Sequence, residues 1–194
     1  GNLDLAYVRV VEETGLPCLL LDFNIPGQAK DCIISDNLDG GFTLTRHLLK
    51  GGRRSIGFVG SIQATSSIME RYLGYQRALR MEGIVPREDW LLEDRDRDGA
   101  FLPLTLPNEL PEAFLCSCDE VAYNLVAALQ EAGVRVPEDV AVCGYDDFRF
   151  ATLCRPQLTT YRVNAGLMAA AAVAWMGRKV RQEPSDTMMM TVPG

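Results

Sequence analysis

The sequence predicts an α/β protein built on a doubly wound sheet of parallel strands. Strand-like and helix-like segments alternate along its 194 residues, and the expected strands are continuous apolar runs. Such strands are buried on both faces, which is typical of a parallel sheet with helical crossovers on either side. The length is enough for one large domain or for two small lobes, each with its own core.

Each element follows from a local pattern. Apolar runs predict strands over residues 17–21, 31–35, 55–60, 90–93, 113–117, 139–144 and 187–192. Apolar residues at helical spacing predict helices over residues 4–14, 40–50, 67–83, 119–133 and 164–181. The stretch 94–112 fits neither pattern, because it is rich in Asp and Arg at first and is then interrupted by three prolines.

Capping residues place the helix starts. Asp4 is expected to cap the first helix. Ser67 with Glu70 three residues later matches a capping box, which predicts a helix start at Ser67. Asp119 is expected to cap the helix that follows strand 113–117, and this role alone accounts for an aspartate at that position.

Composition excludes several classes of protein. The net charge of −7 opposes binding to a phosphate backbone, and no apolar run reaches the length of a membrane span. The start has neither the basic nor the apolar part of a signal peptide. Six cysteines without a CxxC pair, several of them within apolar runs, predict buried free thiols, no metal site and a reducing, cytoplasmic location.

No pattern predicts catalysis or a cofactor. The sequence contains neither GxGxxG nor a Walker A motif, and its single histidine, His47, has no acid–base partner nearby. Ser66 and Ser67 lack a histidine that would activate a serine nucleophile. We therefore expect a binding protein and not an enzyme, with no catalytic residues.

The ends of the predicted strands indicate where a ligand would bind. Ligands of open parallel sheets bind beyond the carboxyl ends of the strands. Aspartates follow several of these ends, namely Asp22, Asp36, Asp119, Asp146 and Asp147. Carboxylates there can accept hydrogen bonds from the hydroxyl groups of a polyol.

Several segments resemble one known family. They are Asp36-Asn37-x-x-Gly40-Gly41, Arg53 to Gly60, Arg71-Tyr72-x-Gly74-Tyr75, Val136 to Asp147 and Arg155 to Thr160. Together they resemble the effector-binding core of LacI/GalR transcription regulators over nearly the whole chain. The resemblance implies a periplasmic-binding-protein-like fold of type I with two lobes, preceded in the family by a helix-turn-helix headpiece.

The resemblance also implies a division of the chain. The headpiece and the first three strands of the first lobe are expected to be absent from this sequence. Residues 1–37 and 160–182 are expected to be remnants of the first lobe. Residues 38–159 and 183–194 are expected to form an essentially complete second lobe.

The resemblance implies roles for a few residues. Arg71 matches the arginine that anchors the effector, and Asp146 matches a strand-end aspartate that binds it. Asp119 and Ser67 complete the expected ligand-binding set, although Cys118 replaces the family's usual Asn or Gly before Asp119. Asp96 falls roughly where relatives commonly have an aromatic side chain that stacks on the sugar. Because this ring is missing, the sequence does not indicate which sugar binds. Alternatives are a surface ion pair for Arg71 and a turn role for Asp146.

The expected function is therefore that of an effector-sensing core, with a sugar or sugar derivative as ligand and DNA bound only through the headpiece. A sugar-binding component of a transport system is the alternative, and a sugar-processing enzyme is a weaker one. We also expect a twofold homodimer, because operator symmetry requires it and because an apolar helix should stay uncovered. That helix carries Leu167, Met168, Val173, Trp175 and Met176.

Overall fold

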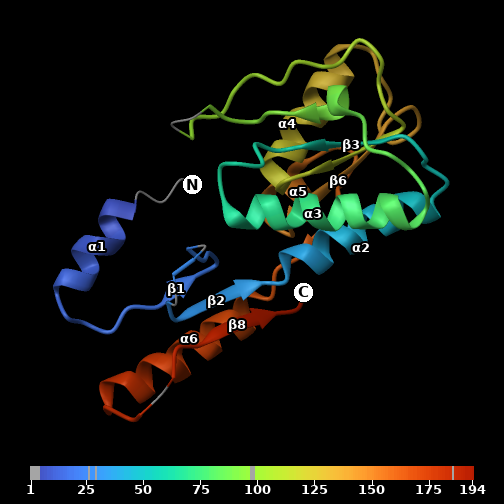
Figure 1. The fold of residues 1–194 in the computed structure, drawn as a ribbon. Helices are drawn as coiled ribbons and strands as arrows, with labels where there is room; N and C mark the ends of the chain where they lie inside the picture. Colours follow the sequence, from blue (N-terminus) through green and yellow to red (C-terminus); the bar gives the residue numbers. More distant parts are fainter. Residues whose placement is uncertain (1–4, 26, 29, 97–98, 185) are drawn as a thin grey trace.

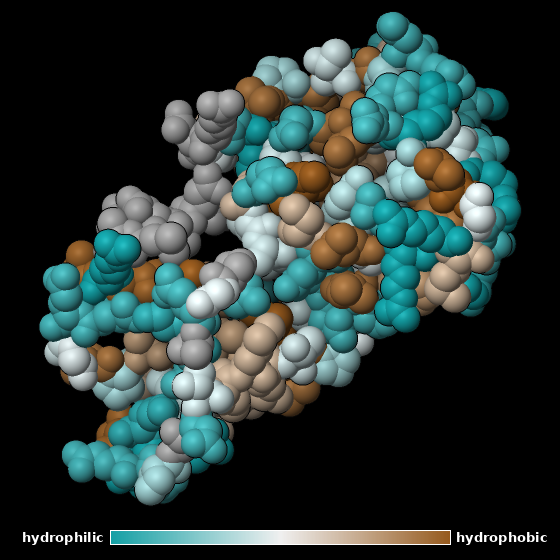
Figure 2. Space-filling view, viewed as in Figure 1, coloured by the Kyte–Doolittle hydropathy of each residue, from teal (hydrophilic) through white to brown (hydrophobic). Residues whose placement is uncertain are grey.

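The computed structural model contains two parallel sheets, and it describes residues 5–25, 27–28, 30–96, 99–184 and 186–194. The first sheet has the order β1-β2-β8 and the second has the order β4-β3-β5-β6-β7. All strand pairs within these sheets are parallel, which confirms the expected α/β class. The two sheets form two lobes of unequal size (Figures 1 and 2).

The elements of the first lobe come from both ends of the sequence. They are α1 (Leu5–Glu13), β1 (Leu20–Leu21), β2 (Cys32–Ser35), α6 (Ala165–Val180) and β8 (Met189–Val192). Neighbouring residues of β2 face opposite cores: Cys32 packs with Val8 of α1, and Ile33 packs with Met168 of α6. Helix α6 therefore packs along one face of this small sheet, whereas α1 reaches the other face through Val8 (Figure 1).

The second lobe is continuous in sequence. Its elements are α2 (Asn37–Lys50), β3 (Ile56–Val59), α3 (Ser66–Met81), η1 (Glu88–Trp90), β4 (Leu91–Leu92), β5 (Ala113–Cys116), α4 (Asp119–Glu131), β6 (Ala141–Asp146), α5 (Arg149–Leu153) and β7 (Thr159–Arg162). Strand β5 is buried throughout. Phe114 packs with the residues of α4 and α5, whereas Leu115 packs with those of α2 and α3. This is the two-faced burial that the apolar runs predict.

Two expected domain boundaries are wrong. Residues 183–194 were expected in the second lobe, but β8 pairs with β2 in the first sheet, where Met190 lies opposite Ile33. Residues 160–182 were expected in the first lobe, but β7 pairs with β6 of the second sheet, and the first-lobe part begins at α6. The apolar run of β8 contains no information about which sheet it joins, and β7 has no apolar run from which a strand could be predicted.

The start of one helix and the N-caps of two others also differ from expectation. Helix α2 begins three residues earlier than Gly40, because the Asp36 carboxylate accepts a hydrogen bond from the Asp39 amide. Helix α3 is capped by the Thr65 hydroxyl and not by Ser67. Helix α4 has Cys118 as its N-cap, without a side-chain capping bond. The expected cap at Asp4 lies outside the described residues.

Helices α2 and α3 pack with their backbones in close contact. A side chain added at Gly41 would overlap the carbonyl of Arg71, and one added at Gly74 would overlap the carbonyl of Leu38. Only glycine lets two helices approach this closely. The contact fixes the start of α3 against the segment where the chain passes from β2 to α2, and it thereby fixes the position of Arg71.

Candidate functional site

A cavity of about 860 Å³ lies between the two lobes, at the carboxyl ends of the strands. Its wall is formed by the segment after β1, the start of α3, the segment after β4, the end of β5, the start of α4 and the end of β6. Charged side chains from these segments line it, namely Asp22, Arg71, Arg95, Glu120 and Asp146. The cavity is where the rule for open parallel sheets places a ligand.

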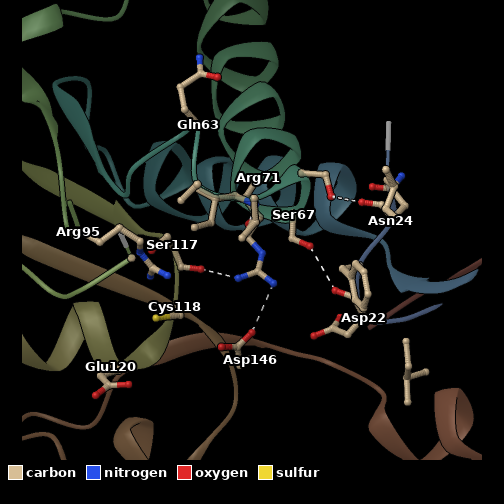
Figure 3. Close-up of a pocket in the computed structure, with 18 of the residues that line it drawn as sticks. Asp22, Asn24, Gln63, Ser67, Arg71, Arg95, Ser117, Cys118, Glu120 and Asp146 are labelled. Atoms are coloured by element: carbon tan, nitrogen blue, oxygen red, sulfur yellow. Dashed lines mark hydrogen bonds and ion pairs between the residues drawn. The ribbon is translucent and has the colours of Figure 1, made fainter. Parts of the chain in front are cut away.

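Arg71 is the central cation of this wall (Figure 3). It is 6% exposed, its Nε donates to Asn37 Oδ1 at 2.9 Å, and its Nη1 donates to the Ser117 carbonyl at 2.5 Å. Its Cζ lies 3.7 Å from the ring centroid of Tyr145. The alternative of a solvated surface ion pair is therefore wrong, because Arg71 is buried and held in a fixed direction.

Asp146 faces Arg71 from the end of β6. Its carboxylate lies 3.5 Å from Arg71 Nη2, and its side chain is 35% exposed. Burial raises the pKa of Asp146 to about 7; Arg71 opposes this rise, and Asp119 and Asp22 add to it. Its φ of 109° lies in a region that few residues other than glycine adopt. This is a carboxylate whose charge is incompletely compensated by the protein.

Asp22 approaches the same cavity from the first lobe. It follows β1, has a φ of 65°, and lines the cavity wall. Burial raises its pKa, and the positive charge of Arg71 partly offsets that effect. Carboxylates from both lobes therefore lie on the cavity wall.

Ser67 lines the cavity, but its hydroxyl is engaged with the opposite lobe. It donates to the carbonyl of Asp22 at 3.4 Å, and the neighbouring Ser66 hydroxyl donates to the carbonyl of Asn24 at 3.4 Å. The first turn of α3 is thus joined to the segment after β1 (Figure 3). The Glu70 carboxylate, expected in a capping box, instead accepts from Asn37 Nδ2 at 3.1 Å.

Asp119 lies outside the cavity lining, unlike the other three expected ligand residues. It is 1% exposed, and its carboxylate accepts from the Phe148 amide at 2.7 Å and from the Thr160 hydroxyl at 2.6 Å. Gly144 leaves no room for a side chain beside this carboxylate. Asp119 therefore stabilises the turn that follows β6, and this turn contains Asp146.

Sequence reasoning missed a second arginine of the wall. Arg95 is 9% exposed, and its Nη2 donates to Asp94 Oδ2 at 2.8 Å. Asp94 also accepts from the Ser61 amide at 2.7 Å and from the Ser117 hydroxyl at 3.3 Å. Burial alone would raise the pKa of Asp94, but the hydrogen bonds from Arg95 and Ser61 outweigh it and lower the pKa.

The same segment supplies an aromatic ring to the cavity. Phe101 lines the wall, is 48% exposed, and lies 4.9 Å from Arg95 Cζ. Backbone pairing between Arg95 and Phe101 brings the two together. The sequence placed this stretch in no element, so only the resemblance drew attention to a nearby position, Asp96. Among the residues that the structure describes, no group of three or more metal-ligating side chains occurs.

Comparisons with known proteins agree with the fold. Residues 45–194 match the model of the periplasmic binding protein-like domain, so the chain belongs to that family. A protein named HTH-type transcriptional repressor PurR from Glaesserella parasuis is 29% identical over 180 residues, which are 89% of this chain and 53% of that protein. The PurR of Haemophilus influenzae is 34% identical over 155 residues, which are 75% of this chain and 44% of that protein.

Solved structures of the family superpose closely. A structure titled transcriptional regulator CelR-cellobiose complex has a TM-score of 0.85 at 23% identity, covering all of this chain and 61% of that one. A LacI-type transcription regulator from Bifidobacterium animalis has a TM-score of 0.75 at 27% identity, covering 90% of this chain and 68% of that one. The chain is therefore a periplasmic binding protein-like domain that is similar to transcription regulators of the LacI type.

The chain spans about half the length of the curated relatives it matches. In the part of the chain that the structure describes, no helix has both the length and the apolar character needed to cross a bilayer.

Proposed function

We propose that this domain binds a small polyhydroxylated effector, a sugar or sugar derivative, in the cavity between its lobes. The observation that carries the proposal is the pairing of Arg71 with Asp146 on the cavity wall, 3.5 Å apart. A guanidinium beside a carboxylate offers a hydroxyl group both a donor and an acceptor. Phe101 adds an exposed ring, on which the apolar face of a sugar can stack.

Binding would draw the two lobes together. Asp22 belongs to the first lobe and Asp146 to the second, so a ligand that bridges them favours the closed arrangement. A ligand shifts such an equilibrium only by its difference in affinity for the two states. We propose that this closure changes the DNA affinity of a headpiece in a cytoplasmic LacI-type regulator. The relatives named as transcriptional repressors favour this function over transport or sugar processing.

The test is a thermal-shift panel of neutral mono- and disaccharides, cellobiose and ribose included, at fixed pH. At least one sugar should stabilise the parent chain, because a ligand that binds only the folded state raises the midpoint of unfolding. Asp146→Asn should abolish that shift. Asp147→Asn is the matched control, because Asp147 is the next residue, also has a positive φ, and pairs with Arg162 instead of lining the cavity.

Two outcomes would contradict the proposal. One is a panel in which no sugar shifts the midpoint of the parent chain. The other is a shift that Asp146→Asn leaves intact. Asparagine tolerates positive φ, so neither substitution should distort the turn.

We also propose that the chain forms a homodimer through α6. Four apolar residues of this helix are exposed, namely Leu167, Val173, Met176 and Val180. Met168 and Trp175, which the sequence placed on the same surface, are buried against the lobe. Light scattering over a concentration series tests this: Val173→Glu should shift a dimer mass towards monomer, and a parent chain that is monomeric at tens of micromolar contradicts the proposal.

A further inference from the structure

Tyr145 connects the cavity with the backbone that joins the two lobes. It is the residue of β6 directly before Asp146, and it is completely buried. Its ring packs against Arg71, which lines the cavity, and its hydroxyl contacts Ser35 and Asp36, the segment between the lobes that we call the lobe crossing.

The ring of Tyr145 contacts the central cation of the cavity. Arg71 Cζ lies 3.7 Å from the ring centroid, which is within the range of a cation–π interaction. The same guanidinium faces Asp146. A ligand that attracts the guanidinium, or that competes for Asp146, therefore changes the contact that Arg71 makes with Tyr145.

The hydroxyl of Tyr145 contacts the segment between the lobes. It donates to the carbonyl of Asp36 at 3.3 Å and lies 3.5 Å from the Ser35 hydroxyl oxygen. Ser35 ends β2 in the first lobe, and Asp36 caps α2 in the second. A Cβ added at Gly40 would lie 2.5 Å from the hydroxyl oxygen of Tyr145, so the first turns of α2 pack directly on it.

Tyr161 extends this contact to the segment after β8. It pairs with Tyr145 in the register of β6 and β7, and the two ring centroids are 5.1 Å apart. The Gly194 amide donates to the Tyr161 hydroxyl at 2.8 Å. The two rings therefore contact both the segment that leaves β2 and the segment that leaves β8.

We propose that Tyr145 is a positioning residue that couples the position of the Arg71 guanidinium to the lobe crossing. Its ring contacts Arg71, and its hydroxyl contacts the Asp36 carbonyl. The inference rests on the proposed function, because it assigns to effector binding the event that moves Arg71. Arg71 also reaches the crossing through Asn37. The two routes make different predictions, because only the first requires the Tyr145 hydroxyl.

Hydrogen exchange on the whole chain, without any ligand, separates the two routes. Arg71→Met removes the guanidinium, and the amides to follow are those of Asp36 and Gly40, which are bonded to the carbonyls of Val192 and Asp36. In the parent chain, Arg71→Met should speed the exchange of these amides about fivefold. In the Tyr145→Phe background, the same substitution should speed it by less than about twofold, because the effects of coupled residues are not additive. Equal effects in the two backgrounds would overturn the proposal and leave the route through Asn37.

Tyr75→Phe is the matched control. Tyr75 is also a buried tyrosine, but its hydroxyl donates to the Ile56 carbonyl at 2.7 Å inside the second lobe. In that background Arg71→Met should still speed exchange about fivefold, because the Tyr75 hydroxyl bonds to Ile56 and makes no bond to Asp36 or to Arg71. If Tyr145→Phe does not fold, Ser35→Ala removes one contact of the hydroxyl and should reduce the Arg71 effect measurably; an unchanged effect there also counts against the proposal.

The outcome is independent of the sugar panel. If no sugar binds but the effects of Arg71→Met and Tyr145→Phe on hydrogen exchange are not additive, the proposed effector is refuted and the coupling between Arg71 and the lobe crossing is supported. If a sugar binds and the two substitutions have additive effects on hydrogen exchange, the proposed effector is supported and the role of Tyr145 is refuted.

Discussion

Two arginine–aspartate pairs, each with its arginine on the cavity wall, differ in the exposure and the pKa of the aspartate. Asp94 is 1% exposed and accepts three hydrogen bonds from the Arg95 guanidinium at 3.2 Å or less, and its pKa is lowered. Asp146 is 35% exposed and lies 3.5 Å from Arg71, and burial raises its pKa to about 7. A carboxylate that the protein satisfies fully has a structural role, whereas one left partly unsatisfied is available to a ligand.

The largest effect should come from breaking the Arg95 pair. Asp94→Ala leaves a guanidinium buried without its partner, which typically costs about 3–5 kcal/mol of the free energy of unfolding. The double variant Asp94→Asn/Arg95→Met should recover at least half of that loss, because it removes both charges. Chemical denaturation measures the free energy of unfolding of the single and the double variant. A single variant as stable as the parent would show that this pair is not structural.

A smaller effect concerns Asp146 and pH. Its pKa is higher in the folded chain than in the unfolded chain, so the folded state binds more protons between about pH 4 and pH 7. The stability that Asp146 contributes is therefore present at low pH and is lost as pH rises through about 7. Asp146→Asn removes this dependence, so its stability relative to the parent should improve between pH 6 and pH 8. A relative stability that is constant over this range would contradict the raised pKa.

The smallest effect should come from a third pair. Arg135 and Asp139 form an ion pair on the surface, where the Arg135 side chain is 72% exposed. Exposed pairs contribute little because water screens them. Arg135→Ala should leave the midpoint of thermal unfolding unchanged, and a marked decrease would show that exposure is a poor guide to the role of these pairs.

The sequence predicted strands buried on both faces better than strands at sheet edges, for a physical reason. Strands such as β5 and β3 are buried on both faces, so their apolar runs are unambiguous. Strand β7 escaped notice because its residues, Thr159 to Arg162, are polar and half-exposed at a sheet edge. Strand β8 was recognised as a strand but placed in the wrong lobe, because its partner β2 is more than 150 residues away in sequence.

The site was predictable in part. Arg71 and Asp146 follow from the resemblance, and the strand-end rule indicated Asp146 independently. Ser67 lies on the cavity wall, its role in ligand binding stays a prediction, and the capping box expected there does not form. Arg95 and Phe101 could not be predicted, because the irregular segment 94–112 has neither a helical nor a strand period. Their contact depends on pairing between Arg95 and Phe101 that only the folded backbone creates.

The comparison of the two pairs is tested most directly by calorimetric titration with the sugar that gives the largest thermal shift. Arg71→Met should weaken its binding about 30-fold, since a hydrogen bond to a charged group contributes roughly 2 kcal/mol. Asp94→Asn/Arg95→Met should bind within about threefold of the parent, because that pair is satisfied by the protein itself. The reverse pattern, with binding lost in the Arg95 variant and kept in Arg71→Met, would contradict the account.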